Sequence, residues 1–195
     1  MGHSALLLVD VQNDFCPGGA LPVPSGDRVI PVLNTLSQQF SDVGLAVFAS
    51  RDWHPPDTTH FKTHGGPWPP HCVAGTPGAQ FHPGLRLPHD TIVVSKGQGK
   101  RDDGYSAFEG TSSDGRTLPE HLRERGITHL YVGGLATDYC VRASVLDARK
   151  AGLDVTVVAD GVAGIGEETT RRALEEMRTA GALVTASQLG RSSSA

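Results

Sequence analysis

A chain of 195 residues, 38% of them hydrophobic, is long enough to bury one sizeable core and short for two independent domains. With a net charge of -4 and no run rich in Lys and Arg, it lacks the basic surface that holds a phosphate backbone, so no nucleic acid partner is expected. Its first apolar run stops at Asp10, far short of a membrane span, and its three cysteines are widely spaced. We expect a cytoplasmic protein with no membrane partner, a single domain over residues 1–190 and a disordered tail over 191–195.

Six short apolar runs rich in Val and Leu recur along the chain, and none alternates cleanly with polar residues, as is typical of strands buried on both faces. They cover residues 5–10, 45–50, 91–96, 129–134, 153–160 and 182–186. Apolar residues have helical spacing over 28–41, 117–125, 139–151 and 167–180. The alternation predicts an α/β fold in which helices cover both faces of a parallel sheet.

Two long segments, residues 11–27 and 53–90, interrupt this alternation and are dense in proline, glycine and histidine. Loops of this length inside a compact domain are usually functional. Phe15 and Trp68 lie in these loops, where a soluble protein has little reason to expose large aromatic side chains. They either pack the loops down or enclose a flat aromatic substrate.

Chemically distinctive residues follow the apolar runs, at the sheet edge where open parallel sheets bind ligands. Asp10 follows the first run, Lys96 the third, and Cys140 the fourth. Cys140 would lie in the first turn of a helix capped by Thr137 or Asp138, and the helix dipole and the lysine would both lower the pKa of its thiol. Position alone leaves this cysteine open between a nucleophile and a core residue. The other two cysteines have no helix start beside them and are expected to be packed spectators.

The loop after the second run carries a carboxylate and several histidines in the stretch SRDWHPPDTTHFKTHGGPWPPHC. Asp52 and His54 are two residues apart, so both side chains can project the same way from an extended segment, as a metal site requires. His60 and His71 can join them from the loop's return path, whereas His64 is followed by GGP and is left out. Mixed imidazole and carboxylate ligands favour Zn²⁺, Fe²⁺ or Mn²⁺. We expect one divalent transition metal; the alternative is a surface loop that is merely rich in histidine.

Six stretches form a combined pattern in this order: LLLVDVQNDFCPGGAL, SRDWHPPDTTHF, WPPHCVAGTPGAQFHP, SKGQGKRDDGYSAFEG, VGGLATDYCVRASVLDA and ADGVAG. The pattern resembles the nicotinamidase/pyrazinamidase branch of the isochorismatase-like cysteine hydrolases and covers nearly the whole chain. The resemblance implies a three-layer α/β/α fold with a six-stranded parallel sheet. It also implies a small-molecule substrate, nicotinamide, hydrolysed to nicotinate and ammonia.

The resemblance further implies a catalytic triad of Asp10, Lys96 and Cys140. The thiol would attack the amide carbon and form a thioester, with Asp10 moving the proton. A cis peptide bond between Leu135 and Ala136 would turn the backbone N–H groups of Ala136 and Cys140 toward one point. Those two groups would then form an oxyanion hole.

The metal and substrate sites implied by the resemblance use the residues of the two long loops. The implied metal ligands are Asp52, His54, His71 and, at a position that varies within the family, His60. The ring nitrogen of the substrate would bind the metal. The side chains expected around the ring are Phe15, Trp68, Tyr105 and Tyr139.

Three alternatives remain open at this stage. The first is an amidase of the same superfamily that acts on another small amide. The second is a metal-dependent hydrolase in which metal-bound hydroxide attacks and Cys140 is a bystander. The third is a non-catalytic module that binds a metal or a pyridine. The sequence leaves the choice between a monomer and a small homo-oligomer open as well.

Overall fold

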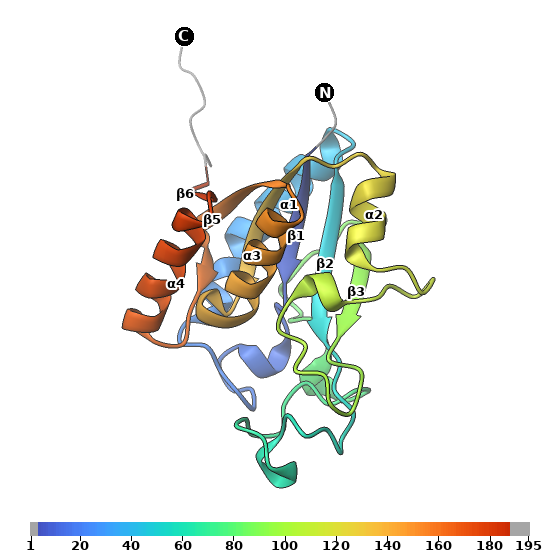
Figure 1. Cartoon of the computed structure of the whole chain (residues 1–195), viewed down its shortest axis with the longest axis vertical. Helices are drawn as coiled ribbons and strands as arrows, with labels where there is room; N and C mark the ends of the chain where they lie inside the picture. Colours follow the sequence, from blue (N-terminus) through green and yellow to red (C-terminus); the bar gives the residue numbers. More distant parts are fainter. Residues whose placement is uncertain (1–3, 188–195) are drawn as a thin grey trace.

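The computed structural model describes residues 4–187, so the tail expected over 191–195 lies outside the described residues. Its centre is a sheet of six parallel strands in the order β3-β2-β1-β4-β5-β6 (Figure 1). The strands are β1 Ser4–Val9, β2 Ala46–Asp52, β3 Ile92–Lys96, β4 His129–Leu135, β5 Asp154–Ala163 and β6 Leu183–Thr185. The predicted six-stranded parallel sheet is confirmed.

Four α-helices cover the two faces of this sheet, as predicted. They are α1 Ile30–Asp42, α2 Leu118–Glu124, α3 Arg142–Lys150 and α4 Glu167–Thr179. The buried residues of α1 belong to the core on one face, and those of α2, α3 and α4 belong to the core on the other. Figure 1 shows this arrangement, with α2, α3 and α4 in front of the sheet and α1 behind it. The three-layer α/β/α architecture is therefore confirmed.

The central strand β1 shows why the apolar runs do not alternate with polar residues. Leu6 and Leu8 pack toward α1, where they share a buried cluster with Leu33. Leu7 points to the opposite face and shares the other cluster with Val145 of α3. Because both faces of the strand are buried, polar side chains would have no solvent to reach at either set of positions.

The ends of the helices follow from local chemistry. Thr117 caps α2: its hydroxyl accepts from the backbone N–H of Glu120, and the Glu120 side chain accepts from the Thr117 N–H, which completes a capping box. Among the described helices, none combines the length and the apolar character needed to cross a membrane.

Candidate active site

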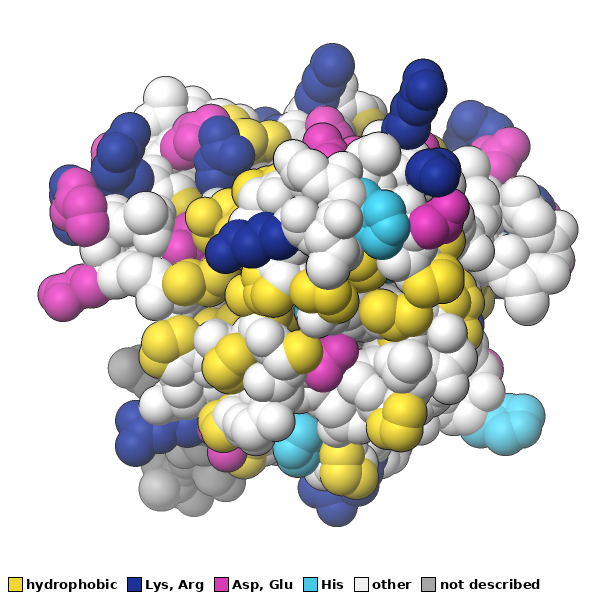
Figure 2. Space-filling view, turned by 90° about the horizontal axis from the view of Figure 1, so that it is seen from below, with side chains coloured by type: hydrophobic (Ala, Val, Ile, Leu, Met, Phe, Trp, Pro, Cys, Tyr) yellow, Lys and Arg dark blue, Asp and Glu magenta, His cyan; other side chains and the backbone are white. Residues whose placement is uncertain are grey.

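The site lies at the carboxyl edge of the sheet, where the chain order of the strands reverses around β1. Asp10 directly follows β1, Asp52 and Lys96 are the last residues of β2 and β3, and Cys140 lies in the turn after β4. These four strands are neighbours in the sheet, so side chains from distant parts of the sequence meet at one place. Figure 2 looks onto this end of the molecule: apolar side chains gather near the middle, and most Lys and Arg side chains stand toward the edges.

Lys96 is the centre of a buried polar cluster. Its Nζ lies 2.8 Å from Oδ2 of Asp10, donates to Oδ1 of Asp52 and to the Gly104 carbonyl at 2.6 Å, and lies 3.5 Å from Sγ of Cys140. The other oxygen of Asp10 accepts from the Ser50 hydroxyl at 2.7 Å. The structure thus brings together the three side chains expected to form the triad.

Burial and the opposite charges set the protonation of this cluster. Burial alone would lower the pKa of Lys96, but Asp10 and Asp52 outweigh it and raise that pKa well above its usual value. Burial raises the pKa of Asp10, against the lowering effect of Lys96. For Asp52, burial acts to raise the pKa, but the charge of Lys96 holds that pKa below the usual range. Lys96 is therefore charged, and Asp10 is the carboxyl that accepts a proton more readily.

The turn that presents Cys140 differs from the one predicted. A π-helical turn, Thr137–Val141, precedes α3. Its N-cap residue is Ala136, not Thr137 or Asp138 as expected. The Asp138 carboxylate instead accepts from the backbone N–H groups of Ile165 and Gly166, ahead of α4. The expected cap is therefore wrong, because this carboxylate finds its donors in a segment distant in sequence.

The expected lowering of the thiol pKa is also wrong. Burial raises the pKa of Cys140 well above its usual value, and the opposing effect of Lys96 does not compensate. The residue is 7% exposed, so water does little to stabilise a thiolate.

The peptide bond between Leu135 and Ala136 is cis, as the resemblance implied. Cys16 and Cys72 are buried free thiols, which fits the expected packing role.

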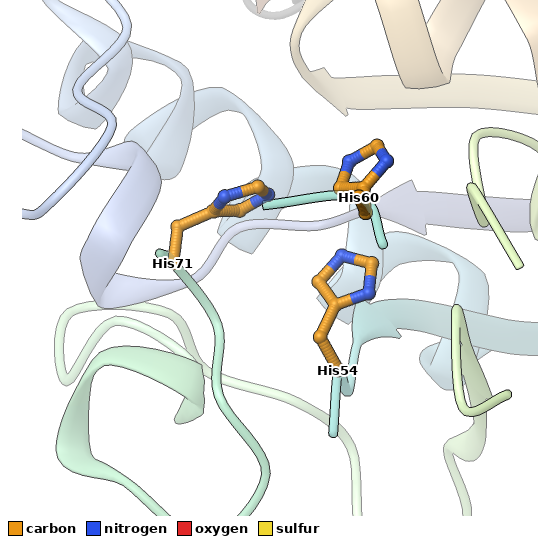
Figure 3. A group of neighbouring side chains, drawn as sticks. All are labelled: His54, His60 and His71. Atoms are coloured by element: carbon orange, nitrogen blue, oxygen red, sulfur yellow. The ribbon is translucent and has the colours of Figure 1, made fainter. Parts of the chain in front are cut away.

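Three histidines converge beside this cluster. One ring nitrogen from each of His54, His60 and His71 lies within 4.8 Å of the others (Figure 3). The returning chain pairs with His54, whose N–H donates to the Cys72 carbonyl at 3.0 Å, and this pairing brings His71 alongside. His64 is exposed and stands outside the group, in line with its exclusion from the expected ligands.

The hydrogen bonds of the three rings leave one nitrogen of each directed into the site. Nδ1 of His54 lies 3.0 Å from the Gly97 carbonyl, and Nδ1 of His71 lies 2.8 Å from the Pro69 carbonyl. Because a carbonyl only accepts, Nδ1 carries the hydrogen in both rings and Nε2 keeps its lone pair. Burial lowers the pKa of His71 to about 4, so this ring is neutral at pH 7. These are the properties of metal-binding imidazoles.

A carboxylate completes a possible ligand set. Oδ2 of Asp52 lies 3.5 Å from Nε2 of His54 and 3.9 Å from Nε2 of His71. Nε2 of His54 is buried and has no hydrogen-bond partner among residues 4–187, which is costly unless a cation or another donor meets it. The donor set of one carboxylate and three imidazoles fits a divalent transition metal such as Zn²⁺, Fe²⁺ or Mn²⁺. Asp52 would then belong both to the polar cluster around Lys96 and to the group of metal ligands.

A pocket lies between the thiol and the histidines, with Cys140, His60 and His71 in its lining. The four aromatic side chains expected around the substrate all line it: Phe15, Trp68, Tyr105 and Tyr139. The indole Nε1 of Trp68 donates to the Tyr105 hydroxyl at 2.8 Å, and the Trp68 ring meets the Tyr139 ring edge-on at 5.0 Å. Ala136 and Cys140 line the same pocket, so its wall offers apolar surface next to the thiol.

Sequence reasoning missed the loop between Lys96 and Tyr105. Its Gly97 and Gly104 carbonyls accept from His54 and Lys96, and its Asp103 carboxylate lies 3.1 Å from Nδ1 of His60. Both glycines have positive φ, +64° and +66°. The available signal for a loop that folds back over the site was a polar stretch that directly follows Lys96 and has a glycine at each end.

Comparisons with known proteins agree with this geometry. A family model described as the isochorismatase domain matches residues 4–188. The nicotinamidase/pyrazinamidase of Mycobacterium tuberculosis is 43% identical over 179 residues, which cover 90% of this chain and 95% of that protein. The nicotinamidase of Escherichia coli is 42% identical over 200 residues, with 93% and 94% covered. The pyrazinamidase of Pyrococcus horikoshii, solved in complex with zinc, has a TM-score of 0.89 at 45% identity and covers 95% of this chain and 99% of its own. The chain therefore belongs to the isochorismatase family.

Proposed function

We propose that this protein hydrolyses nicotinamide, and aromatic amides resembling pyrazinamide, to the carboxylic acid and ammonia. The observation that carries the proposal is the pocket, which lies between the Cys140 thiol and the histidine cluster and has aromatic walls suited to one flat ring. The nicotinamidases of Mycobacterium tuberculosis and Escherichia coli, both similar to this chain over most of its length, support the same substrate.

An amide is a poor electrophile, so its hydrolysis needs a strong nucleophile, a proton for the leaving nitrogen and stabilisation of the oxyanion. Asp10 takes the Cys140 proton as the sulfur attacks the carboxamide carbon. Asp10 then passes this proton to the nitrogen, which leaves as ammonia, and a thioester remains. A water molecule gives a proton to Asp10 as it attacks the thioester carbon. The carboxylic acid leaves, and the proton returns to the sulfur.

The charges of the cluster support these roles. Because burial raises the pKa of Asp10, its carboxyl accepts a proton more readily than an ordinary carboxyl does. Because burial also raises the pKa of the Cys140 thiol, the proton leaves as the sulfur attacks rather than beforehand. Lys96, 3.5 Å from the sulfur, stabilises the negative charge that develops there. The N–H groups of Ala136 and Cys140 are proposed to hold the oxyanion.

The metal is proposed to orient the substrate. The side chains that would hold it are Asp52, His54, His60 and His71. When bound, a divalent ion would take the ring nitrogen as a further ligand and fix the ring in the pocket. The zinc complex of the similar Pyrococcus horikoshii pyrazinamidase supports an ion of this class. Phe15 and Trp68 are proposed to flank the ring, with Tyr105 and Tyr139 closing the pocket.

The decisive experiment is ammonia release from nicotinamide by the pure protein, before and after alkylation with iodoacetamide. We expect ammonia from the untreated protein and none after alkylation. Release from a carbamoylated amine but not from nicotinamide would assign another amidase of the superfamily. Tight binding of nicotinamide without any ammonia would identify a non-catalytic binding module.

Two variants separate the roles of the thiol and the metal. Cys140→Ala should abolish turnover and keep the metal, and substantial residual activity would favour attack by metal-bound hydroxide. His54→Ala should lose metal and raise KM. An unchanged metal content and KM would remove His54 from the ligand set.

The proposed activity also suggests a setting in the cell. Nicotinate from nicotinamide is a precursor for pyridine nucleotides, so we place the protein in NAD salvage. Its three cysteines are all free thiols, which supports the reducing cytoplasm as its location. Light scattering of the pure protein would decide between a monomer and a small homo-oligomer.

A further inference from the structure

The pairing of β1 with β2 stops where the site begins. Val9 is the last residue of β1 to pair, opposite Ser50, and the Asp10 N–H still donates to the Ser50 carbonyl at 3.1 Å. Asp10 then has a φ of +50°, and its carbonyl accepts from the Gln12 N–H at 2.8 Å. This tight turn delivers the Asp10 carboxylate to the site. It also uses up the carbonyl that would otherwise be free to continue the ladder along β2.

The side chain of Gln12 takes the place of the missing strand. Its Oε1 accepts from the Asp52 N–H at 2.8 Å, and its Nε2 donates to the Asp52 carbonyl at 2.8 Å. The same Nε2 donates to the Ala79 carbonyl at 2.9 Å. A primary amide offers the donor and the acceptor of a peptide group, so it can pair with a strand residue as a neighbouring strand would. Gln12 is 0% exposed, and no solvent replaces these bonds if they are lost.

Asp52 is consequently held from both sides at the end of β2. On the β3 side, the next residue along, Trp53, donates its N–H to the Lys96 carbonyl at 2.9 Å. On the β1 side, Gln12 makes the two bonds to the Asp52 backbone. The Asp52 carboxylate divides its oxygens: Oδ1 meets Lys96, and Oδ2 lies 3.5 Å from Nε2 of His54. Any shift of this backbone moves both contacts together.

We infer that Gln12 is a positioning residue for the metal site, which fixes the backbone of Asp52 so that one carboxylate oxygen faces Lys96 and the other faces the histidines. The inference rests on the proposed role of Asp52 as a metal ligand. Gln12 itself touches neither the metal ligand atoms of the histidines nor the thiol. It acts through Asp52, and its loss therefore affects metal binding more than it affects the fold.

The test is the zinc dissociation constant of the Gln12→Met variant, measured by competition with a chromophoric chelator, beside its thermal unfolding. Methionine has a similar length and no amide, so all three hydrogen bonds are lost. Loss of a group that orients a metal ligand typically weakens metal binding by about 10- to 100-fold, and we expect a loss in that range. The matched control is Asn13→Leu. Asn13 donates to the Pro77 carbonyl at 2.8 Å, so it ties down the same loop without touching Asp52.

We expect Asn13→Leu to bind zinc as tightly as the unchanged protein. A folded Gln12→Met with unchanged zinc affinity, or an equal loss in Asn13→Leu, would overturn the inference. If Gln12→Met does not fold, Gln12→Glu decides: it keeps the acceptor for the Asp52 N–H and loses only the bonds that Nε2 donates. Weaker zinc binding by folded Gln12→Glu supports the inference, and unchanged binding overturns it.

The same measurements separate this inference from the proposed metal site. If the unchanged protein binds no zinc, the metal site itself fails and the inference fails with it. If the unchanged protein binds zinc, His54→Ala loses it and Gln12→Met keeps it, the metal site stands and only the role of Gln12 is refuted.

Discussion

Replacing Gly97 by alanine should damage the site more than the fold. Gly97 has a φ of +64°, where an alanine costs about 1 to 2 kcal/mol of stability. A Cβ there would lie 2.4 Å from Cε1 of His54, whereas ordinary van der Waals contact begins at 3.4 Å. The ring or the loop must therefore move by about 1 Å, and a displacement of that size at a catalytic site can cost about 100-fold in rate.

The matched control is Gly115→Ala. Gly115 has a φ of +81° and nothing within 4 Å of its would-be Cβ, so alanine there has the backbone cost without the collision. Denaturant unfolding should show the backbone cost in both variants, with a larger loss of stability in Gly97→Ala because of the collision. Only Gly97→Ala should lose zinc affinity and kcat/KM for ammonia release, the latter by about 100-fold. If the two variants keep equal kcat/KM, the reasoning about His54 is refuted.

Three further predictions concern charge, protonation and helix capping. Lys96→Met should destabilise the metal-free protein by about 3 to 5 kcal/mol, because it leaves the buried carboxylates of Asp10 and Asp52 unpaired. Denaturant unfolding measures this loss, and a negligible loss would contradict the buried ion-pair network. Alkylation of Cys140 by iodoacetamide should keep accelerating as the pH is raised beyond the range in which an ordinary thiol titrates, because burial raises the pKa of this thiol well above that range. A rate independent of pH would mean that the thiolate is already formed. Thr117→Ala should lower the free energy of unfolding by about 1 kcal/mol, because the capping box of α2 is lost. The value of kcat/KM should stay unchanged, and a changed kcat/KM would mean that α2 is coupled to the site.

The residues at the carboxyl ends of the strands could be predicted to lie together, because this prediction needs only the order of strands and helices along the chain. Apolar runs without alternation indicate a parallel sheet, and parallel strands bring their carboxyl ends to one edge. That rule places Asp10, Lys96 and Cys140 at one edge of the sheet, although position alone leaves the role of Cys140 open. The histidine-rich loop could also be predicted as a metal site, because residues of the types that bind metals, histidine and aspartate, are concentrated in one segment.

The features that could not be predicted depend on how deeply a side chain is buried and on partners that are distant in sequence. The pKa of Cys140 was expected to fall because a helix start and a lysine are visible in the sequence, whereas the burial that raises it is not. Asp138 looks like a local cap, yet its donors come from the segment that begins α4. The contact of Asp103 with His60 likewise joins two loops whose meeting depends on the path of the folded chain.

The pairing of β1 with β4 has a consequence for how the protein becomes active during synthesis. These strands are neighbours in the sheet, but α1, β2, β3 and α2 lie between them in the chain. Closing so long a stretch of chain is entropically costly, and parallel pairing across it is slow compared with local folding. Asp10 and Cys140 follow the ends of these two strands, so the carboxyl and the thiol meet only after this step. A growing chain in which these strands have not yet paired therefore lacks the buried cluster that Asp10, Lys96 and Cys140 form in the folded protein.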